Sequence, residues 1–174
     1  MDEHPVRHQA THPFMVNPMA DAPYAQDILA WSDQQADLLR RLARGERVNG
    51  IDWSHVVEEI EDVGLSELNA VRSHLRQMLV HLLKTALWPD HPAARHWKEE
   101  IAAFQAEAEQ RIAPSMRQRI ELDRLFAAAV KQVGASDYGT TAGQAPAACL
   151  CTLDQLLLGE VAALVDQMAV ASGR

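Results

Sequence analysis

Several residue classes are scarce in this chain of 174 residues, and each scarcity excludes a class of protein. Only two cysteines are present, Cys149 and Cys151, which are too few for a disulfide-rich secreted scaffold. Two thiols also cannot complete a structural zinc tetrahedron, and the Cys-x-Cys spacing is awkward for a mutual disulfide. We therefore expect two reduced, partly buried thiols in a cytoplasmic protein.

Long apolar runs are also missing. No run approaches the roughly 20 residues that span a bilayer, and residues 1–22 lack the continuous apolar stretch of a secretory signal. Those residues contain three prolines and little periodicity. We predict a flexible N-terminal arm over 1–22, a single domain over 23–174, and no association with a membrane.

Basic runs are absent, and the formal net charge is −8. Nucleic-acid binding by phosphate neutralisation requires a basic face. A local basic patch keeps nucleic-acid binding open as a third hypothesis, although the net acidity disfavours it. The patch consists of Arg40, Arg41, Arg44 and Arg47.

Aromatic residues make up only 5% of the chain, and no segment alternates apolar and polar residues as a strand does. Apolar residues instead recur at helical spacing. They predict an all-α, up-and-down helical bundle of about five to six helices with one long central helix. The expected helices are 23–44, 53–62, 65–88, 91–113, 115–133 and one that Thr152 caps, with Gln155 completing a capping box. Gly64 either ends the helix before it or only bends one that continues to Trp88.

The segment 65–88 has the clearest period. Its apolar residues step by three or four positions, which is typical of a helix packed in a bundle. They are Leu68, Val71, Leu75, Met78, Leu82 and Ala86.

A polar edge flanks this apolar stripe. Glu67, His74, His81 and Trp88 occur at every seventh position, so they line one side of the helix. The two histidines lie about 10 Å apart along it and cannot share one ion. A metal site would therefore combine one histidine with carboxylates from another helical segment.

The metal hypothesis takes Glu58, Glu61 and His81 as ligands of a divalent ion. The competing interpretation, which we favour, treats both histidines as boundary residues satisfied by carboxylates or backbone groups. It treats the acidic cluster as a solvated face or as partners of arginines. Neither a nucleophile-elbow motif nor a phosphate-loop motif is present, and no other cofactor is expected.

Several sequence blocks occur in an order that resembles a known family. The chain is similar to the bacterial domain-of-unknown-function family twenty-nine over residues 23–158. The resemblance implies an all-helical fold and no established activity, so it carries over no catalytic residue. The blocks are Tyr24-x-x-Asp27-x-x-x-Trp31 with Gln34-Gln35, Ile51-Asp52-Trp53, Glu58-Glu59-Ile60-Glu61, Gly64-x-Ser66-Glu67, Leu79 to Lys84, Pro89, Trp97 and Thr152 to Leu157.

The leading hypothesis is a non-catalytic interaction or structural protein that exposes an apolar seam to a protein partner or to a second copy in a homodimer. The rival is a small metal-dependent enzyme with the carboxylate and histidine ligands given above. The residues expected to form a functional surface are Asp27, Trp31, Glu67, His74, Lys84, Trp88 and Trp97.

Overall fold

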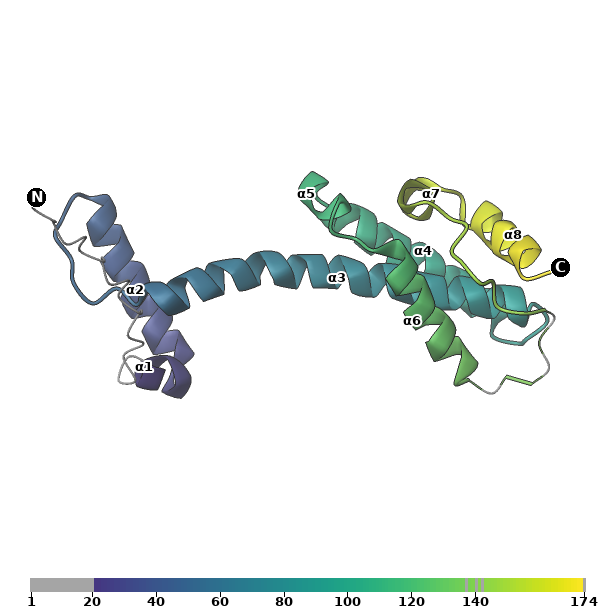
Figure 1. The fold of residues 1–174 in the computed structure, drawn as a ribbon, viewed down its shortest axis with the longest axis horizontal. Helices are drawn as coiled ribbons and strands as arrows, with labels where there is room; N and C mark the ends of the chain where they lie inside the picture. The colour runs from purple at the N-terminus through teal and green to yellow at the C-terminus, as the bar shows by residue number, and fades with distance from the viewer. Residues whose placement is uncertain (1–20, 137, 140, 142, 174) are drawn as a thin grey trace, which may run out of the picture. The chain divides into compact units, whose positions relative to one another are not determined.

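The structure is a computed structural model that describes residues 21–136, 138, 139, 141 and 143–173. These residues form helices and no strand (Figure 1), which confirms the all-α prediction with one long central helix. Apart from two residues at the start of α1, the predicted arm lies outside the described residues. The helices are α1 Asp21–Gln26, α2 Ile28–Ala43, α3 Trp53–Leu87, α4 Ala94–Arg111, α5 Pro114–Arg117, α6 Leu122–Gly134, α7 Leu153–Leu158 and α8 Val161–Ala171.

Residue contacts divide the chain into two compact units, 1–61 and 62–174. The first unit contains α1, α2 and the start of α3. The second contains the rest of α3 and the helices that follow it. The single domain predicted over 23–174 stays a prediction.

In the first unit, the expected helix 23–44 is interrupted at Asp27. This residue has φ −152° and ψ 88°, and its side chain accepts a hydrogen bond from the backbone N–H of Ala30 at 3.0 Å. Aspartate is a strong N-cap, so it ends α1 and starts α2. Gly45 follows α2 with φ 81°, as expected for a glycine that terminates a helix.

Gly64 does not interrupt α3. The segments predicted as 53–62 and 65–88 form one helix of 35 residues. Glycine costs about 1 kcal/mol within a helix, which is too little to break one whose flanks both favour the helical conformation.

The apolar stripe predicted along 65–88 forms the centre of the second unit, and its six residues are at most 1% exposed. Helices α4, α6, α7 and α8 cover it, with α4 contacting both α7 and α8 (Figure 1). None of the helices in the described part of the chain has the length and hydropathy needed to cross a bilayer. The covering side chains include Trp97, Ile101, Ala108, Phe126, Ala129, Val133, Leu156, Leu157, Leu164 and Met168.

Two further predicted helices are each divided. The expected helix 115–133 forms α5 and α6, and the last helix forms α7 and α8. Gly159 separates α7 from α8, where a Cβ would lie 2.5 Å from the carbonyl oxygen of Gln155. The capping box of Thr152 and Gln155 is confirmed at the start of α7.

Candidate functional site

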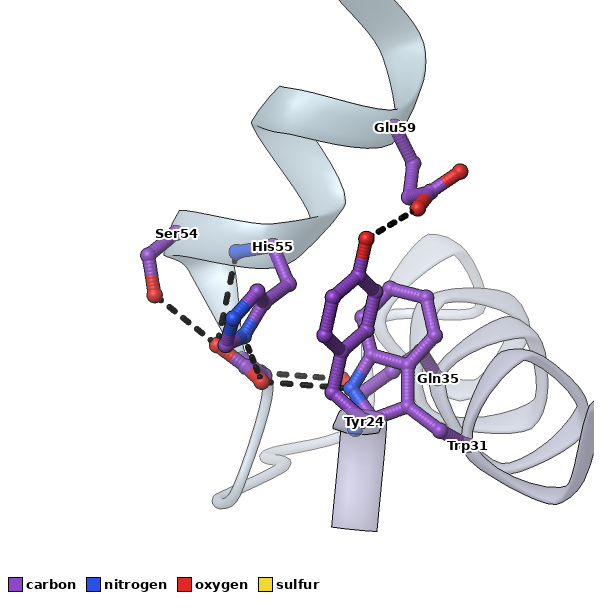
Figure 2. Close-up of polar contacts among 7 residues, drawn as sticks. Tyr24, Trp31, Gln35, Ser54, His55 and Glu59 are labelled. Atoms are coloured by element: carbon purple, nitrogen blue, oxygen red, sulfur yellow. Dashed lines mark hydrogen bonds and ion pairs between the residues drawn. The ribbon is translucent and has the colours of Figure 1, made fainter. Parts of the chain in front are cut away.

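A hydrogen-bond network centred on Asp52 joins elements of the first unit. Figure 2 labels its partners Trp31, Gln35, Ser54 and His55. Asp52 directly precedes α3. Its Oδ1 accepts hydrogen bonds from Ser54 Oγ at 2.9 Å and from the backbone N–H of His55 at 3.5 Å. This is the geometry of an N-cap, which satisfies backbone donors that the helix leaves without partners.

The second carboxylate oxygen reaches α2. Asp52 Oδ2 accepts from Trp31 Nε1 at 3.1 Å and lies 2.7 Å from His55 Nδ1. The backbone N–H of Asp52 donates to Gln35 Oε1 at 2.9 Å. Trp31 and Gln35 are each only 5% exposed, so these bonds are shielded from water and costly to leave unmade.

Aromatic contacts add α1 to the network. The Tyr24 ring stacks on His55 with centroids 4.0 Å apart and meets the edge of Trp31 at 4.9 Å. The Tyr24 hydroxyl donates a hydrogen bond to the carboxylate of Glu59. Tyr24 therefore ties α1 to both α2 and α3 (Figure 2).

The chemistry of Asp52 follows from these contacts. Burial raises the pKa of its carboxyl, but hydrogen bonds from His55, Ser54 and Trp31 outweigh burial and hold that pKa below its ordinary value. A carboxylate has about four lone-pair positions, and the donors described here occupy them. Asp52 therefore joins α2 to the start of α3 as a charged acceptor, and its carboxylate is already engaged by donors of the chain itself.

A pocket of about 280 Å³ lies beside the network. Trp31, Gln35 and Asp52 contribute to its wall, together with Gly50 and Ile51 from the turn before α3. The imidazole of His55 is not among the residues that line it. The imidazole that would act as a general base therefore does not line this pocket.

An apolar strip on α3 lies directly after the network. Trp53, Val57 and Ile60 are 55%, 51% and 68% exposed. We call these three residues the open seam. Two further steps of four residues lead from Ile60 through Gly64 to Leu68, so the helical spacing of the open seam continues along the sequence of α3 into the apolar stripe.

The predicted metal ligands have different surroundings. Glu58 and Glu61 are exposed residues of the first unit. In the second unit, His81 Nε2 lies 3.0 Å from one oxygen of Glu100, whose other oxygen lies 3.5 Å from His96 Nε2. Among the described residues, no three His, Cys, Asp or Glu side chains are grouped so that they could hold a metal ion. The ligand set stays a prediction.

His81 is buried in the second unit, with 8% of its surface exposed. Burial lowers its pKa and Lys84 adds to the effect, while Glu100 acts in the opposite direction. Its Nδ1 has no hydrogen-bond partner within the described part of the chain. A neutral imidazole with one orphaned nitrogen fits a core residue.

The remaining residues of the predicted polar edge also have partners in the second unit. Glu67 pairs with Arg111 at 3.5 Å, and the His74 ring lies 6.1 Å from Phe104. Glu67, His74 and His81 thus each contact a residue of α4, and their interpretation as boundary residues stays a prediction.

The predicted surface residues Lys84, Trp88 and Trp97 form an aromatic cluster with Tyr138. The Lys84 ammonium lies 5.7 Å from the Trp97 ring and 5.3 Å from the Tyr138 ring, as in cation–π contacts. Trp88 Nε1 donates to the carbonyl of Gly139 at 2.9 Å. Tyr138 was not among the predicted surface residues.

The sequence blocks that carried the family resemblance contain the network residues Tyr24, Gln35, Asp52 and Glu59. Of all the network residues, only Trp31 was expected on a functional surface. His55 carried no sequence signal beyond its place near the helix start. The family model described as "Domain of unknown function DUF29" matches residues 23–160. This chain belongs to the DUF29 family.

A solved structure resembles this DUF29 chain. It is the crystal structure of an alpha-helical protein of unknown function from Rhodospirillum rubrum ATCC 11170, with a TM-score of 0.59 and 27% sequence identity. The similarity covers 83% of this chain and 96% of that one. No curated protein matches this DUF29 chain. The predicted family is therefore confirmed, and neither similarity assigns an activity.

Proposed function

We propose that this protein is a non-catalytic interaction protein of the bacterial cytoplasm, and that it binds an amphipathic helix of another protein along the open seam. The observation that carries the proposal is the exposure of Trp53, Val57 and Ile60, each more than half exposed. Their helical spacing matches the anchor positions that a partner helix uses.

The size of these side chains makes the surface energetically significant. Fully burying a valine or isoleucine side chain contributes about 1.5–3 kcal/mol, and half of that area is still exposed at each position of the open seam. Tryptophan is also enriched among the residues that dominate interface energies.

The charges beside the open seam select the partner. Glu58 and Glu61 are exposed, and at 3.6 residues per turn they lie about 100° and 40° around the helix from Val57. A second copy packed antiparallel on this seam would bring carboxylates against carboxylates, which opposes association. A helix with lysines or arginines beside its apolar face is complementary, so we favour such a partner over the homodimer.

The Asp52 network supports the proposal by fixing the start of the seam. Asp52 caps α3 immediately before Trp53, while Tyr24 and Trp31 pack on the adjoining face of the helix. A pre-organised surface loses less conformational entropy when it binds. The network thus has a structural role in presenting the seam.

A designed peptide tests this function with the intact protein. The probe has leucines at the a and d positions and lysines at the flanking positions of about three heptads. A second peptide carries glutamates instead of lysines. We expect the lysine peptide to bind and to shift tryptophan emission, with binding weakened about tenfold in Ile60→Ser, corresponding to about 1.4 kcal/mol.

Leu29→Ser provides the matched control, because Leu29 is 69% exposed but lies on α2. Its affinity for the lysine peptide should be unchanged. Equal binding of both peptides, or equal weakening in both variants, would refute a specific site on the seam. A concentration-dependent dimer that Ile60→Ser abolishes would instead assign the seam to a second copy.

The metal-dependent enzyme remains the alternative prediction. Protein purified without an affinity tag should then contain about one equivalent of a divalent metal, and His81→Ala should lose it. Protein that contains no metal but still binds the lysine peptide at the open seam would argue against the enzyme and support the interaction role.

A further inference from the structure

A pocket of about 510 Å³ lies in the second unit between α6 and the segment 145–149. Its volume falls in the range of small-molecule sites. Phe126, Ala127 and Val130 line it from α6, and Pro146 lines it from the opposite segment. Two of its lining residues carry reactive or charged groups, Cys149 and Asp123.

The two cysteines differ in their access to this pocket. Cys149 is half-buried on the pocket wall, whereas Cys151 is only 4% exposed and packs in the core. Cys149 Sγ lies 3.5 Å from the carbonyl oxygen of Cys151. Between them, the Leu150 carbonyl accepts a hydrogen bond from Gln167 Nε2 at 2.9 Å. The backbone is therefore anchored so that one sulfur reaches the pocket and the other does not.

The two thiols also differ in acidity. A hydrogen bond from the Cys151 thiol lowers the pKa of Cys149 to about 7, although burial and Asp123 act in the opposite direction. The same hydrogen bond, together with burial, raises the pKa of Cys151. Near neutral pH, Cys149 is therefore partly thiolate and Cys151 stays protonated. A thiol whose pKa lies near the ambient pH is the most effective attacking group in thiol–disulfide exchange.

We propose that Cys149 is a thiol–disulfide exchange site for small, uncharged, apolar disulfides that enter this pocket. The Cys149 thiolate attacks one sulfur of the disulfide, and a new S–S bond forms as the bond within the ligand breaks. The electron pair leaves with the second sulfur, which departs as a thiolate. Cys149 is thereby oxidised to a mixed disulfide, and the departing half of the ligand is reduced.

Cys151 acts on Cys149 as a positioning residue. It is buried, and its Cys-x-Cys spacing disfavours an intramolecular disulfide, so it does not displace the bound half of the ligand. The mixed disulfide persists until an external thiol reduces it. The apolar wall and the Asp123 carboxylate disfavour anionic disulfides at the same sulfur.

Two disulfide reagents test this site on the intact, reduced protein. Dithiodipyridine is uncharged, whereas dithiobisnitrobenzoate is dianionic. Relative to an unstructured cysteine peptide, the protein should react several-fold faster with the first reagent and show no acceleration with the second. Mass spectrometry should find one adduct per chain, on Cys149, and the rate should rise with pH with a midpoint at about 7.

Variants separate the pocket from the thiol pair. Ala127 is exposed on α6, so Ala127→Phe should fold, fill the pocket and slow the uncharged reagent several-fold without moving the pH midpoint. Cys151→Ala should move that midpoint towards about 8.5, the ordinary thiol value. Cys151→Ser retains a donor and should move it less, and its folding can be checked independently.

Three results would each overturn the proposal. The first is a ratio of rates for the two reagents equal to that of the cysteine peptide. The second is an unchanged rate in Ala127→Phe. The third is simultaneous labelling of Cys151 or formation of a Cys149–Cys151 disulfide in the folded protein.

Discussion

Replacing Asp52 with asparagine keeps the size of the side chain but exchanges one acceptor oxygen for a donor amide. If the amide nitrogen takes the Oδ2 position, Trp31 Nε1 and His55 Nδ1 face a donor and lose their acceptor. If it takes the Oδ1 position, the cap on the backbone N–H of His55 is lost. Neither orientation preserves every hydrogen bond, so the network is disrupted in both.

The magnitude follows from the bonds that are lost. Leaving the N–H of the buried Trp31 without an acceptor costs about 1–3 kcal/mol, and loss of a helix N-cap costs about 0.5–2 kcal/mol. Because the amide occupies one orientation at a time, these costs are alternatives. We expect a loss of about 2 kcal/mol in the first unit, equivalent to about 30-fold in its opening equilibrium.

Hydrogen exchange followed by mass spectrometry measures this effect in each unit separately. Amides of α2 should exchange about 30-fold faster in Asp52→Asn, while those of α4 should not change. Asp27→Asn is the control, because it makes the same chemical change at an exposed cap where asparagine is equally favourable. Unchanged exchange in α2, or equal acceleration in α4 and in the control, would refute the structural role assigned to Asp52.

Other predictions concern the second unit and α3. Because the pKa of His81 is lowered, its neutral form stabilises the fold above about pH 6.5 and that stability is lost as the pH falls below it. Urea midpoints should therefore drop between about pH 7.5 and 5.5, and less so in His81→Gln. Gly64→Ala should raise stability by about 0.5–1 kcal/mol, because a Cβ there meets nothing within 4 Å; an unchanged midpoint would argue against a continuous α3. Gly159→Ala should lower the urea midpoint because its Cβ would meet the Gln155 carbonyl, and Ile101→Ala should cost about 2–5 kcal/mol because this side chain is fully buried.

The positions of the helix ends separate what could be predicted from what could not. The capping box at Thr152 was identified because it satisfies a helix terminus with atoms a few residues away. The break at Asp27 was not predicted, and the sequence left open whether Gly64 ends the helix, because each is a small local preference. Neighbouring segments decide such cases through packing.

The candidate sites show a similar division. The sequence placed Trp31 on a functional surface, but it did not connect this residue with Tyr24, Asp52 and His55. Those contacts join residues that are separated by up to 31 positions in the chain. The sequence singled out the polar side of α3, and only the positions of Glu100 and Arg111 on α4 show that His81 and Glu67 have partners there.

The sequence by itself therefore determined the helical class, the apolar stripe of α3 and the family, since periodicity and short motifs depend on neighbouring residues alone. Only the tertiary structure decided where that stripe is covered and where it stays exposed. It also decided that hydrogen-bond donors surround the Asp52 carboxylate, and that Cys149 lines a pocket whereas Cys151 does not. Burial and hydrogen-bond partners come from residues far apart in the chain, and no local pattern encodes them.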